Sequence, residues 1–223
     1  MHIDETQFPI EPAWEGVLAP PAGVFAMRGE ELPRVSLGQP TWWSDQKVLG
    51  EKWTPPAGGQ RYGLARFAFS LRPQGRQTVR RAEFMVYLHA KGAGPRPTAF
   101  DLFPQAVTEE QTGAVTVGIG PDFKFAGAEA SLAKAETTIN LRQAAPVITA
   151  DGVGEHTARW VFVARAAHPL TGSQTVYIIV ELPPGVPAAR ASLQLSAEVT
   201  TRFGPVRGLL PETERASLSW VLE

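Results

Sequence analysis

The chain contains no cysteine among its 223 residues, which excludes disulfides, thiolate zinc sites and a cysteine nucleophile. Its formal net charge of −1 removes the long-range attraction that drives non-specific binding to nucleic acid. No apolar run approaches the ~20 residues that a membrane-spanning helix needs. The P-loop, the Gly-x-Ser-x-Gly elbow and the His-Glu-x-x-His motif are also missing. We therefore expect no cofactor, and we expect neither a membrane nor a nucleic acid as the partner.

The N-terminus carries early acidic residues and no apolar core after them, so a secretory signal is not predicted. The expectation is a cytoplasmic protein. Frequent Ala, Arg, Gly and Pro, with Asn140 as the single asparagine, are typical of a GC-rich bacterial genome.

Alternation of apolar and polar residues is the dominant pattern, and it is clearest in Ala191–Thr201. A period of two is typical of a strand with one buried and one wet face. Similar segments recur every 8 to 15 residues or so between Pro and Gly clusters, a spacing typical of sandwiches. Near-continuous apolar runs at 160–163 and 176–180 predict central strands that are covered on both faces. The prediction is an all-β, antiparallel β-sandwich of about nine or ten strands, with a β-barrel as the alternative.

Residues 1–60 differ in composition from the rest, because they hold eight of the 20 prolines and four of the six tryptophans. Proline removes a backbone donor, so this stretch cannot be a series of central strands. We expect an extended arm, packed on the sheets, with short edge strands around Val24–Met27 and Arg34–Leu37. Residues 61–223 are expected to form the β-sandwich domain.

One candidate catalytic cluster is Asp151, Glu155 and His156. A histidine with two carboxylates can serve as a general base or hold a metal. Acids spaced by glycine are equally what a hairpin turn contains. We predict no metal site, and a hydrolase centred here is the second functional hypothesis.

Two candidate binding surfaces stand out. Arg72, Arg76, Arg80 and Arg81 form a basic hairpin that can bind phosphate or an acidic partner, or can protect an edge strand from aggregation. The pair Trp42–Trp43 offers an aromatic anchor, because adjacent strand residues point to opposite faces.

The leading hypothesis is a non-catalytic protein that docks another macromolecule through the basic hairpin and the aromatic arm. Another protein is the expected partner, in a homo-oligomer or a larger assembly. A membrane-perturbing or pore-forming protein is the third hypothesis, because amphipathic strands such as Ala191–Thr201 could line a pore. Any sandwich face needs the same alternation.

Overall fold

The structure is a computed structural model. Ten ranges of the chain are described, and for residues 108–109, 115–118 and 137–139 the description covers the backbone alone. The described residues are 11–21, 32–44, 55–56, 58–109, 115–118, 137–139, 147–165, 170–202, 204–211 and 218–222.

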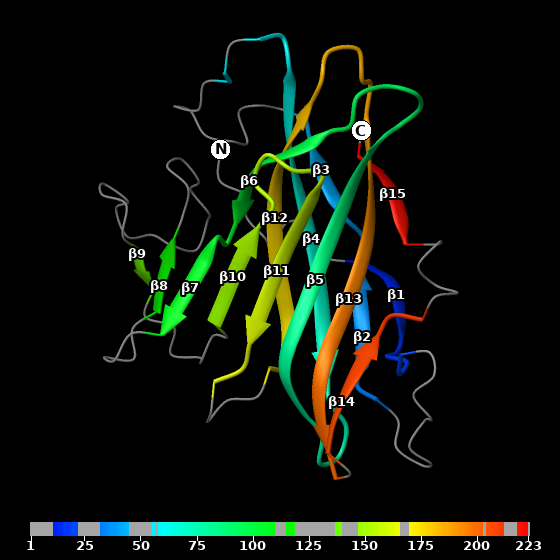
Figure 1. Cartoon of the computed structure of the whole chain (residues 1–223), viewed down its shortest axis with the longest axis vertical. Helices are drawn as coiled ribbons and strands as arrows, with labels where there is room; N and C mark the ends of the chain where they lie inside the picture. The colour runs from blue at the N-terminus through cyan, green and yellow to red at the C-terminus, as the bar shows by residue number, and fades with distance from the viewer. Residues whose placement is uncertain are drawn as a thin grey trace.

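The described part is all strand, arranged as two antiparallel sheets packed face to face (Figure 1). The six-stranded sheet has the order β1-β2-β4-β12-β6, with β3 paired to β4. Its strands are β1 (Pro12–Val17), β2 (Arg34–Gly38), β3 (Thr41–Trp43), β4 (Arg61–Arg72), β6 (Thr98–Phe103) and β12 (Gly172–Leu182).

The nine-stranded sheet has the order β14-β13-β5-β11-β10-β7-β8-β9, with β15 also paired to β13. Its strands are β5 (Thr78–Ala90), β7 (Ala106–Glu109), β8 (Val115–Gly118), β9 (Thr137–Ile139), β10 (Val147–Asp151), β11 (Thr157–Val163), β13 (Ala189–Thr201), β14 (Gly204–Leu209) and β15 (Ser219–Leu222). The predicted all-β sandwich is confirmed, and the barrel alternative is wrong because neither sheet closes on itself within these strands.

The main core lies between the two sheets, where the alternating apolar residues of both inner faces meet. The ring of Phe69 on β4 stacks on Phe84 of β5 at 5.0 Å and meets Phe162 of β11 edge-on at 5.1 Å. Trp160 is fully buried beside them, and its indole Nε1 donates to the carbonyl of Pro104 at 3.0 Å. Burial of these rings contributes most of the free energy that holds the sheets together.

One side of the sandwich is sealed where β1 continues towards β14. Ala19 and Leu209 exchange two backbone hydrogen bonds of 2.8 Å, joining the edges of the two sheets. Gly208 permits this contact, because a Cβ there would lie 2.9 Å from the Cβ of Leu18. The two sheet edges can therefore approach this closely only because residue 208 has no side chain.

The other side is sealed through the β10–β11 turn. The amide of Ala99 on β6 donates to the carbonyl of Glu155 at 2.8 Å, and the amide of Gly154 donates to the carbonyl of Ala99 at 2.7 Å. These bonds connect an edge strand of the six-stranded sheet with the nine-stranded sheet. Edge amides that are paired in this way are unavailable to another chain.

Three strands from the first 60 residues belong to the six-stranded sheet. β2 coincides with the strand expected around Arg34–Leu37, but it lies between β1 and β4 and is not an edge strand, so that detail of the prediction is wrong. The strand expected at Val24–Met27 lies outside the described residues. The division into an arm of residues 1–60 and a domain of residues 61–223 stays a prediction. In the described ranges, no helix has the length and hydropathy needed to cross a membrane.

Candidate functional site

The three side chains considered for catalysis have separate surroundings around the β10–β11 turn. The carboxylate of Asp151 lies 3.6 Å from Nη1 of Arg159, and Nδ1 of His156 lies 2.9 Å from the carbonyl oxygen of Pro97. The side chain of Glu155 is exposed. No hydrogen bond or ion pair joins these three described residues to one another. The backbone of Gly154 and Glu155 bonds to β6, and the positive φ angles of Gly152 and Gly154 account for the glycines in the turn.

The described residues contain no group of three or more His, Asp or Glu side chains that could hold a metal ion. The hydrolase hypothesis therefore gains no geometric support from the part of the chain in view.

Within the basic hairpin, the structure places Arg72 apart from the other three arginines. Its guanidinium contacts the hydroxyl of Ser36 and lies 2.6 Å from Oε1 of Glu15 on β1. The hydrogen bond from the Ser36 hydroxyl, and then the charge of Arg72, lower the pKa of Glu15 below its ordinary value of 4.5. Arg72 thus fastens β1 to β2 and β4.

The other three arginines of the basic hairpin differ in how far they are exposed. Arg76 and Arg80 are exposed, whereas Arg81 is half-buried on β5. Their role in binding stays a prediction.

The two tryptophans face opposite sides of the six-stranded sheet, as adjacent strand residues must. Trp42 packs against the main core, where a Cβ at Gly63 would overlap its ring. Trp43 lies on the outer side with its ring centroid 5.6 Å from the guanidinium carbon of Arg66. Arg66 is only 3% exposed and donates to Oγ1 of Thr41 at 2.9 Å. Both indoles are half-buried, so neither is a free anchor.

A second buried cluster covers the outer face of the six-stranded sheet. Tyr62, Leu64, Tyr177 and Ile179 are buried there, which confirms that β12 is covered on both faces. Desolvation raises the pKa of Tyr62, and the neighbouring Glu181 carboxylate, which accepts from the phenol at 3.2 Å, raises it further. This face is therefore occupied within the chain.

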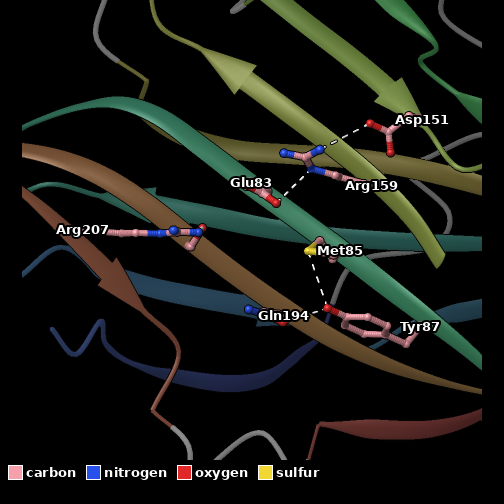
Figure 2. Close-up of polar contacts among 8 residues, drawn as sticks. Glu83, Met85, Tyr87, Asp151, Arg159, Gln194 and Arg207 are labelled. Carbon is pink, nitrogen blue, oxygen red and sulfur yellow. Dashed lines mark hydrogen bonds and ion pairs between the residues drawn. The ribbon is translucent and has the colours of Figure 1, made fainter. Parts of the chain in front are cut away.

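The outer face of the nine-stranded sheet is different, because polar side chains cross it from strand to strand (Figure 2). Nε of Arg159 on β11 donates to Oε1 of Glu83 on β5 at 2.9 Å. On the neighbouring strands, the phenol of Tyr87 donates to Oε1 of Gln194 at 2.9 Å. The sequence alone did not single out these residues. They occupy the polar positions of alternating strands, and this was the one feature that could have pointed to them.

At one end of this sheet, β7, β8 and β9 form a ladder of short strands (Figure 1). β8 pairs with β7 on one side and with β9 on the other, both antiparallel. The β8–β9 register places Val115 opposite Ile139 and Val117 opposite Thr137. The two strands are therefore antiparallel neighbours, and 18 residues separate them in the sequence.

The alternating segment Ala191–Thr201, offered as a possible pore wall, lies in β13. It pairs with β5 on one side and with β14 and β15 on the other, and its apolar residues lie in the main core. Its alternation therefore serves the sandwich, as in any half-buried strand.

No family model matches the chain, and no curated protein matches it. The solved structures to which the chain is similar include three at low identity. The Clostridium perfringens NetB toxin in its membrane inserted form is 8% identical, with a TM-score of 0.37 over 87% of this chain and 89% of that chain. Clostridium perfringens delta-toxin is 8% identical, with a TM-score of 0.38 over 95% and 92%. A pore forming protein is 7% identical, with a TM-score of 0.27 over 93% of each chain.

These findings contradict the leading functional hypothesis and the expected location. The matched structures are toxins and a pore forming protein by name, one of them inserted in a membrane, and none is named as a cytoplasmic docking protein. The expectation that a membrane is not a partner loses its support for the same reason. Within the chain itself, Arg72 is engaged by Glu15 and Trp42 packs against the core, so these two of the proposed docking side chains already have partners.

Proposed function

We propose that this protein perforates membranes, and that each of several copies contributes the hairpin 115–139 to a transmembrane β-barrel. The observation that carries the proposal is the β8–β9 register, considered together with the sequence between these strands. In each observed pair the two residue numbers add to 254. In the proposed barrel, a continuation of this register would set Ile119 opposite Ala135 and Phe125 opposite Glu129, with a turn at residues 126–128.

The length of this hairpin suits a bilayer. Each arm, 115–125 and 129–139, would have 11 residues in this register. A transmembrane strand tilted by ~45° needs about 9 to 11 residues to cross the hydrocarbon core. Pro121 lacks a backbone N–H and would leave one ladder bond unmade. The other residues of both arms can donate.

The two faces of the hairpin differ as a pore wall requires. Odd-numbered residues of the first arm are uncharged, and they include Val115, Val117, Ile119, Phe123 and Phe125. Even-numbered positions carry four of the five charges of the segment. Those four are Asp122, Lys124, Lys134 and Glu136, and the fifth charge, Glu129, adjoins the turn. A lipid-facing apolar side and a water-facing charged side are the pattern of a barrel wall.

The position of the hairpin suits a conformational change. β7, β8 and β9 have four, four and three residues, so few ladder hydrogen bonds hold them. To cross a bilayer, β8 leaves β7 and pairs with a neighbouring copy. The smallest membrane barrels have about eight strands. Because one hairpin supplies two strands, at least about four copies are needed, and a homo-oligomer is part of the proposal.

Dye release from phosphatidylcholine–phosphatidylserine vesicles tests the proposal. Wild-type protein is expected to release an entrapped dye. Ile119→Arg places a cation on the lipid face, at a cost of ~2–4 kcal/mol near the bilayer midplane, and should abolish release. Asp122→Arg introduces the same side chain on the opposite face and should retain release. A wild-type protein that leaves vesicles intact, or two variants that behave alike, would overturn the proposal.

A further inference from the structure

We propose that the outer face of the nine-stranded sheet, formed by β5, β11, β13, β14 and β15, receives a second copy of this chain. We call this surface the assembly face. The inference rests on the proposed function, because a barrel built from hairpins needs several copies side by side.

Two edge strands of the sandwich already have partners across the sheets. The Ala19–Leu209 bridge joins β14 to the chain after β1, and on the other side Ala99 of β6 exchanges hydrogen bonds with Glu155 and Gly154. The outer face of the six-stranded sheet already buries Tyr62 and its neighbours. The assembly face is the broad surface of the described sandwich that remains, and β5 and β13, with 13 residues each, run its full length (Figure 1).

Three charged side chains of the assembly face form no ion pair with another described residue. In the strand registers, Glu198 on β13 is opposite Arg81 on β5 and Arg207 on β14. Neither arginine forms an ion pair with Glu198 or with another described residue. Among the described residues, Arg207 has one hydrogen bond, of 3.4 Å, to the hydroxyl of Ser196. A row of three strands thus presents positive, negative and positive charge in turn.

Apolar side chains lie on the same face. Val163 on β11 and Val221 on β15 are 40% and 36% exposed, and they are two of the three large apolar residues exposed in the described ranges. The registers pair them with Arg81 and Arg190, whose alternation places all four on the outer face. Tyr87 and Met85 are half-buried between them. Tyr, Met and Arg are the side chains that protein interfaces favour over the remaining surface.

The occupant that fits is an identical chain. A row that alternates in sign complements the same row of a second copy displaced by one strand, since Glu198 of each copy then faces an arginine of the other. This contact joins the copies in pairs. The net charge of −1 imposes little repulsion between copies. A strongly acidic or basic partner would instead meet like charge on part of every row.

A matched pair of double variants tests the assembly face. Val163→Arg with Glu198→Arg adds bulk and positive charge on the face. Val153→Arg with Glu155→Arg makes the same changes at an exposed valine and an exposed glutamate of the β10–β11 turn. All four substituted side chains are exposed, so both variants should fold, and thermal melting checks this.

Self-association is measured by chemical cross-linking on phosphatidylcholine–phosphatidylserine vesicles and by sedimentation in solution. Wild-type protein and the turn variant are expected to form multimers, and the face variant should form at least tenfold less. Equal association of both variants, or a wild-type protein that stays monomeric in both settings, would overturn the proposal.

Dye release separates this inference from the proposed function. If the face variant stops associating while wild-type multimers release no dye, the assembly face stands and pore formation fails. If wild type releases dye and the face variant still associates and releases dye, pore formation stands and the assembly face fails.

Discussion

Nε of Arg159 lies 2.9 Å from Oε1 of Glu83, a contact between two residues that are 76 positions apart in the chain. It joins β11 to β5 on the assembly face. Nη1 of the same arginine approaches Asp151 at 3.6 Å, so β10 is connected to the same group. β10 is the strand beside β7. The contacts of Arg159 therefore join β5, β11 and β10, the strands next to the short β7–β9 ladder.

The Arg159–Glu83 pair is expected to stabilise the fold modestly. The two side chains are 35% and 19% exposed, so solvent screens their attraction. A double-mutant cycle with Arg159→Gln and Glu83→Gln should give a coupling of about 0.5–1 kcal/mol in urea unfolding. Asp151→Asn is the control and should change little, since its carboxylate is 66% exposed and farther away. A coupling of zero between Arg159 and Glu83 would contradict the assignment.

Gly208 should be intolerant of a side chain. A Cβ there would lie 2.9 Å from Cβ and 3.0 Å from Cδ1 of Leu18. Gly208→Val should therefore destabilise the protein by about 1–3 kcal/mol through overpacking. Faster hydrogen exchange at the amides of Ala19 and Leu209 should show that the seal opens. Arg207→Val, one residue away and exposed, serves as the control, and equal exchange in the two variants would refute the prediction.

Glu15 is expected to make stability fall in acid. Its folded-state pKa is lowered from 4.5, so its contribution is present above the unfolded value and is lost as the pH falls through the folded value. Glu15→Gln should lower the melting temperature slightly at neutral pH, and the difference from wild type should shrink as the pH falls below 4.5. Added salt should shrink it, because the pair with Arg72 is exposed. A difference that persists unchanged at low pH would argue against this role.

A disulfide between β7 and β8 should lock the proposed hairpin. Thr108 and Thr116 are directly opposite in the register, and the chain has no other cysteine to interfere. Directly opposed antiparallel residues have Cα atoms about 4.5 to 5.5 Å apart, within the range that a disulfide spans. The variant Thr108→Cys with Thr116→Cys should release no dye when oxidised and should regain release on reduction. Release by the oxidised form would show that β8 need not leave β7.

Alternation predicted the strands well where one face of a strand is buried. β13 coincides with the segment that alternation indicated, because burial in a sheet repeats every two residues. β12 coincides with the near-continuous apolar run at 176–180, because both of its faces are covered. The expected edge strand at Arg34–Leu37 was found but misplaced, since the prolines around it mark breaks in the chain and not its position in the sheet.

The candidate site was harder to predict. Arg72 looked like a docking group until Glu15, 57 residues earlier in the chain, was seen to neutralise it. Asp151 and His156 are close in sequence but turn to different partners, Arg159 and Pro97. The polar contacts of the assembly face join strands that are distant in sequence, and no local pattern reports which strands are neighbours.

The sequence by itself determined the class of fold, the absence of thiol chemistry and the amphipathic character of residues 115–139, because composition and period are local properties. The tertiary structure alone decided which strands pair, in which register, and which charges stay unpaired. Those features arise from contacts between residues far apart in the chain. The β8–β9 register lies at that boundary, since the alternation is local but the pairing that turns it into a two-faced hairpin is not.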